Sequence, residues 1–385
     1  VDGVERDIYA PYIPNAFVHV RPELNENSSV TAIFGAGEGD TNYEEDGRTP
    51  KGADPIGDML QDRSYVLVDI PEGYTKLKNT KIYGAGSFHG LGMWIPKATA
   101  DNPERADSAT AVIDLIRGEL NEVHGGGYEE GLTRRTLVNV PDGSVVKVGK
   151  IFGGSEGTSI DKVCDVYESH VNYNSETATV GTLYGGNNNV RQTLYAHVDV
   201  SKPAWSDRDR GYKATVYGAG YGLDTRANYT EVNLNDGATV YEVYGGGEMG
   251  RVVNVATSAK IAEDSGSTLP KLPNGYGDGD KYPTGLADGL AKVRLDGLKH
   301  NTNVLIHKGA TVENYAYGGG RGYDDENTGD GDVNGTTYIA LMGGTVKKDI
   351  YAAGTIGAVL DEYGNINDYR GQTFVADATA YIAGG

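Results

Sequence analysis

The sequence predicts an all-β protein that folds as a single right-handed parallel β-helix of about ten coils. Three observations lead to this prediction. A five-residue phrase, an apolar residue and an aromatic followed by small residues, recurs along the chain, as in VYGGG from Val243. Alternating apolar positions and a glycine-marked turn precede several copies, as in TEVNLNDGATVYEVYGGG from Thr230. No segment carries a sustained 3.6-residue apolar stripe, so we expect little helix.

The spacing of the phrase sets the size of the repeat. Its copies begin at Ile33, Ile82, Val123, Ile151, Leu183, Val216, Val243, Ala316 and Ile350. The aromatics Tyr217 and Tyr244 are 27 positions apart, and Tyr317 and Tyr351 are 34 apart. A kelch-type propeller blade needs four strands and about 50 residues, which exceeds most intervals here. One coil per interval fits better, and the rule for parallel crossovers makes the helix right-handed.

Stacking would place the residue before the glycines at the same point of every coil. We therefore expect an aromatic ladder made of Phe34, Tyr83, His124, Phe152, Tyr184, Tyr217, Tyr244, Tyr317 and Tyr351. The glycines would turn the chain sharply, with positive φ allowed and no side chain to collide with the next coil. A phosphate-binding glycine loop needs a following helix and a lysine, as in GxxxxGK[ST], and no copy supplies them.

A solenoid grows by adding coils, so residues 1–385 are predicted to form one continuous domain. The longer intervals place their extra residues after the aromatic-Gly-Gly corners, which predicts long corner loops and one large loop insertion at 256–290. The chain begins with Val and ends inside a repeat, TAYIAGG from Thr379. We therefore expect a fragment of a larger chain, with coil ends that other segments cap or that associate end to end.

Charge and cysteine content narrow the class of partner. The formal net charge of -20 argues against nucleic acid and anionic membrane surfaces. No apolar run is long enough to span a bilayer. The single cysteine, Cys164, excludes an internal disulfide framework and a Cys-rich metal site, and we expect it to be a buried filler.

The strand, glycine turn and aromatic-Gly-Gly corner resemble the right-handed parallel β-helix regions of bacterial surface proteins and adhesins. These include the surface proteins of Bacteroidetes-type bacteria and the passengers of autotransporters. The likeness covers nearly the whole chain and is one of architecture. It implies an extracellular or cell-surface location and a rod-like scaffold, and it carries over no functional residue.

One motif points to calcium. DGDVNG from Asp330 matches the first half of a calcium loop and would bring oxygens of Asp330, Asp332 and Asn334 around one point. The twelfth position is Leu341, where a bidentate Glu is needed, so a complete EF-hand loop is excluded. Calcium is thus the one candidate cofactor, at a partial site; a solvated acidic turn is the alternative.

Aromatic residues after the glycine corners suggest a contact surface for a glycan or a protein. The candidate ligand-binding residues are Tyr43, Trp94, Tyr128, Tyr221 and Tyr323. Tyr and Trp among polar groups suit both sugar stacking and protein interfaces. Alternatively, individual rings fold back to cover the flank of the solenoid.

The prediction for function is a secreted or surface-exposed structural or adhesive scaffold without catalytic residues. One alternative is a polysaccharide lyase or glycoside hydrolase of β-helical fold, which needs a convergent acid/base set on neighbouring coils. Its candidate is the charged loop WSDRDRGYK from Trp205, although alternating charges usually pair with each other. Another alternative is a self-assembling filament or surface-layer subunit.

Overall fold

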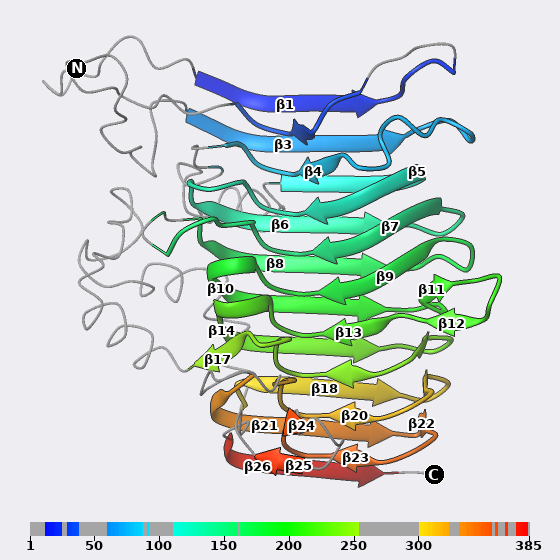
Figure 1. The fold of residues 1–385 in the computed structure, drawn as a ribbon, viewed down its shortest axis with the longest axis vertical. Helices are drawn as coiled ribbons and strands as arrows, with labels where there is room; N and C mark the ends of the chain where they lie inside the picture. Colours follow the sequence, from blue (N-terminus) through cyan, green and yellow to red (C-terminus); the bar gives the residue numbers. More distant parts are fainter. Residues whose placement is uncertain are drawn as a thin grey trace, which may run out of the picture.

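The fold is all-β, with a long sheet of parallel strands in a solenoid-like architecture. The computed structural model describes residues 12–24, 29–37, 60–87, 91, 111–160, 162, 164–253, 300–322, 331–355, 359–360, 366–368 and 375–383. None of these described residues lies in a helix, and the described part of the chain therefore contains no membrane-spanning helix. Figure 1 shows the strands stacked along one axis, from β1 at one end to β26 at the other.

The longer strands form one row of the stack, in which each strand pairs in parallel with the next. They are β1 (Tyr12–Val20), β3 (Leu60–Asp69), β5 (Ala111–His124), β6 (Thr133–Val140), β8 (Val166–Tyr173), β10 (Asn188–Val200), β14 (Tyr221–Leu234), β18 (Thr302–His307), β21 (Val333–Met342) and β26 (Val375–Ala383).

Shorter strands that end in the repeated phrase form a second parallel row, joined by the second half of β5. They are β2 (Ala32–Phe34), β4 (Lys81–Tyr83), β7 (Val145–Phe152), β9 (Thr179–Tyr184), β13 (Thr215–Tyr217), β16 (Val243–Tyr244), β20 (Ala316–Tyr317) and β23 (Ile350–Tyr351).

The remaining strands are short. A small parallel sheet contains β15 (Thr239–Val240), β19 (Thr311–Val312) and β22 (Thr345–Val346). β17 (Arg251–Val253) pairs with β14 and β21. Two antiparallel pairs are β11 (Trp205–Asp207) with β12 (Tyr212–Lys213), and β24 (Val359–Leu360) with β25 (Ile366–Asp368).

The predicted aromatic ladder is confirmed at all nine positions. Ring centroids of adjacent members lie 4.6–5.1 Å apart, with interplanar angles of 2–13°. The residue before each ladder position, such as Val123 or Val216, instead points into the main core, because successive side chains of a strand face opposite ways. The ladder is therefore a second hydrophobic layer on the outer side of the short strands.

The glycines at the corners avoid a collision with the next repeat, as predicted, but they do not have the positive φ that was allowed for them. None of Gly84, Gly125 and Gly218 has a positive φ. A Cβ on any of them would instead lie 2.2–2.3 Å from the carbonyl oxygen of the equivalent glycine in the next repeat. Positive φ occurs at turn glycines such as Gly143 and Gly237, between the long and short strands. The corner requires glycine for close approach of two backbones, and the turn requires it for conformation.

A row of hydroxyl groups inside the stack ties the long strands to the corners. Each hydroxyl donates a hydrogen bond to the carbonyl oxygen of the first small residue after the ladder aromatic in the same repeat. The donors are Ser64, Thr136, Ser169, Thr230, Thr302 and Thr337. Ala111 and Ala196 occupy the same position in the two intervening repeats.

The last strand pairs two residues out of the predicted register. The match of TAYIAGG with the copy at Thr336 would place Tyr338 opposite Tyr381, but Tyr338 lies opposite Thr379. A shift of two residues keeps every side chain on its face, so the alternation alone does not distinguish the two registers. The predicted insertion at 256–290 lies outside the described residues.

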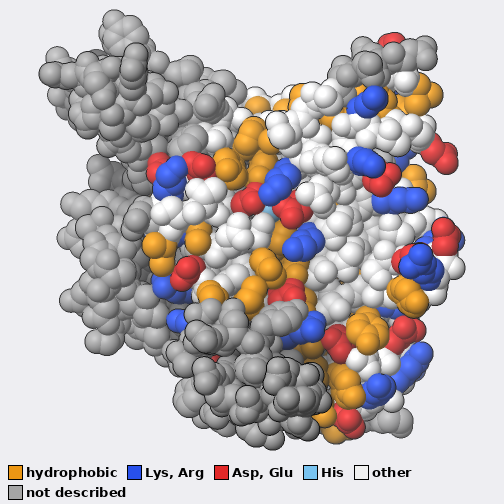
Figure 2. Space-filling view, viewed as in Figure 1, with side chains coloured by type: hydrophobic (Ala, Val, Ile, Leu, Met, Phe, Trp, Pro, Cys, Tyr) orange, Lys and Arg blue, Asp and Glu red, His pale blue; other side chains and the backbone are white. Residues whose placement is uncertain are grey.

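Charged side chains of both signs are interspersed over the face viewed in Figure 2, along a stripe of hydrophobic side chains. Several ion pairs join neighbouring repeats, including Arg117 with Asp69 and Lys347 with Glu313. Exposed pairs of this kind contribute little to stability, about 0–1 kcal/mol each. The charges therefore maintain solubility more than they hold the stack together.

Candidate functional site: a polar groove across the long strands

A line of Asn and Asp side chains crosses the outer face of the long strands. Paired directly across β5, β6, β8, β10 and β14 are Asp114, Asn139, Asn172, Asp199 and Asn233, here called the polar row. Each lies between two inward apolar residues, as Asp199 does between Val198 and Val200, so strand alternation turns it outward. Leu67 and Leu305 occupy the same position on β3 and β18 and bound the row.

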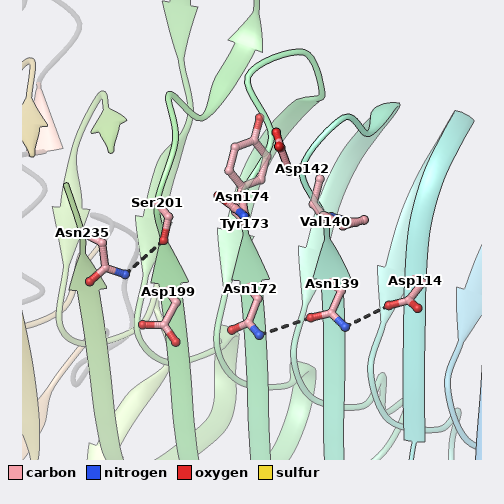
Figure 3. Close-up of a pocket in the computed structure, with 11 residues that line it drawn as sticks. Asp114, Asn139, Val140, Asp142, Asn172, Tyr173, Asn174, Asp199, Ser201 and Asn235 are labelled. Carbon is pink, nitrogen blue, oxygen red and sulfur yellow. Dashed lines mark hydrogen bonds between the residues drawn. The ribbon is translucent and has the colours of Figure 1, made fainter. Parts of the chain in front are cut away.

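A pocket of ≈ 530 Å³ opens over the polar row. Its lining combines four members of the row with the segments that follow the strands: Asp114, Asn139, Val140, Pro141, Asp142, Asn172, Tyr173, Asn174, Asp199, Ser201 and Asn235. Figure 3 shows Asp114, Asn139, Asn172 and Asp199 side by side on four neighbouring strands. The pocket therefore runs across the strands, along the axis of the stack.

The amides of the polar row are oriented by hydrogen bonds along it. Asn172 Nδ2 donates to Asn139 Oδ1 at 3.2 Å, and Asn139 Nδ2 donates to Asp114 Oδ1 at 2.9 Å (Figure 3). The Tyr65 hydroxyl donates to the other oxygen of Asp114. Burial and this hydrogen bond raise the pKa of Tyr65 to about 12. Asp114, Asn139 and Asn172 are thus held in place as one chain of donors and acceptors.

The pocket is acidic. Its lining includes the carboxylates of Asp114, Asp142 and Asp199 and contains no Lys, Arg or His. The one lining aromatic, Tyr173, is 1% exposed, and its hydroxyl donates to Ala178 O at 2.7 Å, so it offers no stacking surface. Such a pocket suits a neutral, hydroxyl-rich ligand or a cation and repels polyanions.

Two imidazoles lie beside the polar row, two residues upstream in their strands. His170 on β8 and His197 on β10 are direct cross-strand partners, with ring centroids 5.0 Å apart. His197 Nε2 lies 2.9 Å from Asp199 Oδ2, and its Nδ1 lies 3.2 Å from the Tyr195 hydroxyl. Burial is the largest single effect and raises the pKa of Asp199, but the interactions with His197, Asn233 and His170 together outweigh it, and the net pKa is lowered. An ionised carboxylate held by an imidazole therefore faces the pocket.

His170 forms the second imidazole–carboxylate pair. Its Nε2 lies 2.7 Å from Glu168 Oε1, which also accepts from Arg135 Nη2 at 3.2 Å. Burial lowers the pKa of His170 more than the neighbouring Glu168 raises it. The imidazole is therefore neutral at neutral pH.

The spacing of the carboxylates limits what chemistry the pocket supports. Asp114 and Asp199 are separated by three strand spacings, about 14 Å. Glycoside hydrolysis by paired carboxylates needs a separation of about 5–9.5 Å. These two residues therefore do not form a hydrolase pair, and Asp199 is instead in contact with the imidazole of His197.

Two of the sequence-predicted binding residues, Tyr128 and Tyr221, lie in a column of corner residues away from the polar row. Tyr128 packs against the ladder ring of Tyr83, with centroids 5.5 Å apart, and Tyr221 packs edge-on against that of Tyr184 at 6.0 Å. Lys150 Nζ lies 4.6 Å from the centroid of the Tyr221 ring. Both rings are partly exposed, and their binding role stays a prediction. Tyr43, Trp94 and Tyr323 lie outside the described residues.

The predicted calcium residues are only partly described. Asp332 O accepts a hydrogen bond from Val252 N at 2.8 Å, and Asn334 lies opposite Val253 where β21 pairs with β17. Asp330 lies outside the described residues, so the partial calcium site stays a prediction.

The charged loop after Trp205 folds back on itself. Arg210 Nε lies 3.4 Å from Asp207 Oδ2, and Lys213 Nζ lies 3.3 Å from the centroid of the Trp205 ring. These contacts match the self-paired interpretation of the loop.

The sequence reasoning missed the polar row, although a signal for it exists. The triplets IDL from Ile113, VNV from Val138, VNY from Val171, VDV from Val198 and VNL from Val232 each place Asn or Asp between two apolar residues. Aligned by the repeat, they put one polar side chain at the same outward position of five consecutive long strands.

No protein-family model matches the chain, and neither curated proteins nor solved structures give a significant match. Function is therefore inferred from the chemistry of the polar row and its pocket.

Proposed function

We propose that this protein is a secreted or cell-surface scaffold that binds a neutral glycan in the groove over the polar row. One observation carries the proposal: four amide and carboxylate side chains from consecutive strands line one pocket. Their spacing of about 4.8 Å is that of the strands and is comparable to the length of one sugar residue. Each sugar unit of a glycan lying along the axis of the stack would therefore meet one polar side chain of the protein.

The proposed frame is a right-handed parallel β-helix of about ten coils, with residues 1–385 as one domain. The unbroken parallel pairing from β1 to β26 supports about ten coils, and the handedness follows the general rule for parallel crossovers. A rigid rod of this kind would hold the polar row at a fixed pitch. This favours binding, because the protein loses little conformational entropy when the ligand binds.

The charge of the pocket selects the class of glycan. Amides both donate and accept hydrogen bonds and carboxylates accept them, which matches sugar hydroxyls. Three carboxylates without a lining cation disfavour uronic acids and sulfated sugars. We therefore expect neutral glycans to bind and polyanionic ones not to bind.

The direct test is a screen of the protein and of Asn172→Leu against an array of neutral, acidic and amino-sugar glycans. Leucine is the matched replacement, because Leu67 and Leu305 occupy this position on β3 and β18, the strands that bound the polar row. We expect the wild type to retain a neutral glycan and Asn172→Leu to lose it, while the remote variant Lys347→Ala behaves as wild type. Retention of acidic glycans alone, or equal retention by wild type and Asn172→Leu, would refute the proposal.

A second function, polysaccharide cleavage, is favoured by the contact between His197 and Asp199 beside the pocket. This pair could transfer a proton to or from a bound sugar. Incubation with each retained glycan should then produce new reducing or unsaturated ends, and His197→Gln should abolish them. If the glycan is retained but stays intact, the protein is a binding scaffold only.

A further inference from the structure

A second buried polar cluster lies far from the polar row, at the one ladder position that is not Phe or Tyr. His124 stacks between Tyr83 and Phe152, with ring centroids 4.9 and 5.0 Å away. Glu122 precedes it by two residues on β5 and points to the same side. Glu156 comes from the corner that follows β7 in the next repeat. One strand and the corner of the next repeat thus bring one imidazole and two carboxylates to one point.

The geometry of the three groups is that of a ligand set. His124 Nε2 lies 3.4 Å from Glu122 Oε2 and 3.5 Å from Glu156 Oε2. One ligand atom from each of the three residues lies within 4.8 Å of the other two. A tetrahedral zinc ion with bonds of about 2.0–2.1 Å separates its ligand atoms by about 3.3–3.4 Å. Both nitrogen–oxygen distances are close to this value.

His124 is also not satisfied as an ordinary core residue. Its side chain is 0% exposed, and neither ring nitrogen makes a hydrogen bond of acceptable geometry with the described residues. Phenylalanine fills the same position at Phe34 and Phe152 with no polar atom to satisfy. A buried imidazole that faces two carboxylates needs either a proton or a metal ion between them.

A cation already occupies the mouth of the cluster. Lys81 Nζ lies 2.9 Å from Glu122 Oε2 and 2.7 Å from Glu156 Oε1, and its side chain is 31% exposed. The Tyr83 hydroxyl donates to Glu156 as well. The cluster therefore already binds a positively charged group between its two carboxylates, and the partly exposed lysine can leave toward solvent.

We propose that Glu122, His124 and Glu156 form a binding site for a divalent transition-metal ion of the Zn²⁺ type, and that Lys81 is the resident cation which the metal displaces. One imidazole nitrogen and two carboxylate oxygens suit Zn²⁺ and its neighbours in the first transition row. Calcium is disfavoured, because it takes six to eight oxygen ligands and the cluster supplies an imidazole. The metal would join two adjacent repeats through residues that the ladder and the corner hold in place.

The test is calorimetric titration of the chelator-treated protein with Zn²⁺ alone, in parallel with four variants. His124→Phe is the matched variant, because Phe34 and Phe152 show that the ladder accepts this ring. Glu156→Gln removes a second ligand, and Lys81→Met removes the competing cation. Lys347→Ala, whose ion pair with Glu313 lies elsewhere on the surface, serves as the unrelated control.

We expect one Zn²⁺ per chain in the wild type, at least about tenfold weaker binding in His124→Phe and Glu156→Gln, and at least about tenfold tighter binding in Lys81→Met. Zn²⁺ should also raise the melting temperature of the wild type but not that of His124→Phe, and this shift is a second measurement of binding besides calorimetry. Ca²⁺ should do neither.

Three results would overturn the proposal. Equal Zn²⁺ affinity in the wild type and His124→Phe would place the metal elsewhere. Binding by Lys81→Met but not by the wild type would make Lys81 a permanent structural counter-ion. No binding by either protein, with circular dichroism showing that both are folded, would make the cluster a closed ion-pair network.

Discussion

The Thr230 hydroxyl donates a hydrogen bond of 2.5 Å to the carbonyl oxygen of Gly245, from a long strand to a corner of the same repeat. Both groups are buried, and the contact recurs along the stack wherever the inward position of the long strand is Ser or Thr. A buried carbonyl group gains about 0.5–1.5 kcal/mol from such a bond. The hydroxyl row is therefore part of what fixes the corner.

Ala196→Ser should stabilise the protein. Ala196 lies between Ser169 and Thr230 in the row, so a serine hydroxyl would face the carbonyl oxygen of Gly218. We expect the free energy of unfolding in urea to rise by up to about 1 kcal/mol. A loss of stability would show that this repeat has no room for the hydroxyl, and Thr230→Val should cost a similar amount as the reciprocal control.

Gly218→Ala should be far more damaging than Gly143→Ala. A Cβ on Gly218 would lie 2.3 Å from Gly245 O, whereas a Cβ on Gly143 would meet nothing within 4 Å and would carry only the cost of its φ of 77°. We expect losses of more than about 3 kcal/mol for the first variant and about 1–2 kcal/mol for the second. Equal losses in urea denaturation would contradict the close-approach role of the corner glycines.

Phe152→Leu separates ring stacking from hydrophobic volume. Phe152 is fully buried between His124 and Tyr184, with centroids 5.0 and 4.6 Å away. Leucine should cost about 1–3 kcal/mol for two lost stacked pairs, and alanine about 3–5 kcal/mol for the added cavity. If Phe152→Leu leaves the free energy of unfolding unchanged in thermal and urea denaturation, the ladder stabilises the protein through hydrophobic volume alone.

Stability should fall as the pH drops below about 6.5, and His170 should contribute to the fall. Burial lowers the pKa of His170 below its unfolded value, so the unfolded chain binds the proton more readily than the folded one. The stabilisation that comes from His170 is fully present above the pKa that this imidazole has in the unfolded chain. It is lost as the pH falls through the lower pKa of His170 in the folded protein.

His170→Gln provides the control for that titration. Glu168, Arg135, Tyr195 and His197 surround the ring and remain in the variant. Urea unfolding at a series of pH values should show a shallower loss of stability for His170→Gln than for the wild type. Identical slopes would mean that His170 does not titrate in this range.

The ladder could be predicted because its signal is local: one aromatic recurs beside glycines, and stacking fixes where it lies. The role of the corner glycines was half predicted. The close approach of Gly245 O to Gly218 agrees with the expectation that no side chain fits against the next repeat, whereas the positive φ allowed for the corner does not occur. The φ angle depends on the path of the backbone, which the composition of the phrase does not specify. The positions of the corner residues were thus predicted more reliably than the backbone conformation of the glycines among them.

The polar row and the cluster at His124 depend on contacts between repeats. Asn139 and Asn172 are 33 positions apart and meet only after the long strands pair in register. Lys81 and Glu156 are 75 positions apart and come from different parts of the repeat. The sequence predicts His124 as a ladder member, and strand alternation places Glu122, two residues earlier, on the same side. Nothing local indicates Glu156, which comes from the next repeat.

The most direct test of the account is the structure of the protein in complex with a neutral oligosaccharide from the array. The account predicts that the sugar lies in the pocket along the axis of the stack, with its hydroxyls hydrogen-bonded to Asn139, Asn172 and Asp199. A sugar that instead stacks on the corner rings Tyr128 or Tyr221, and leaves the polar row in water, would contradict it.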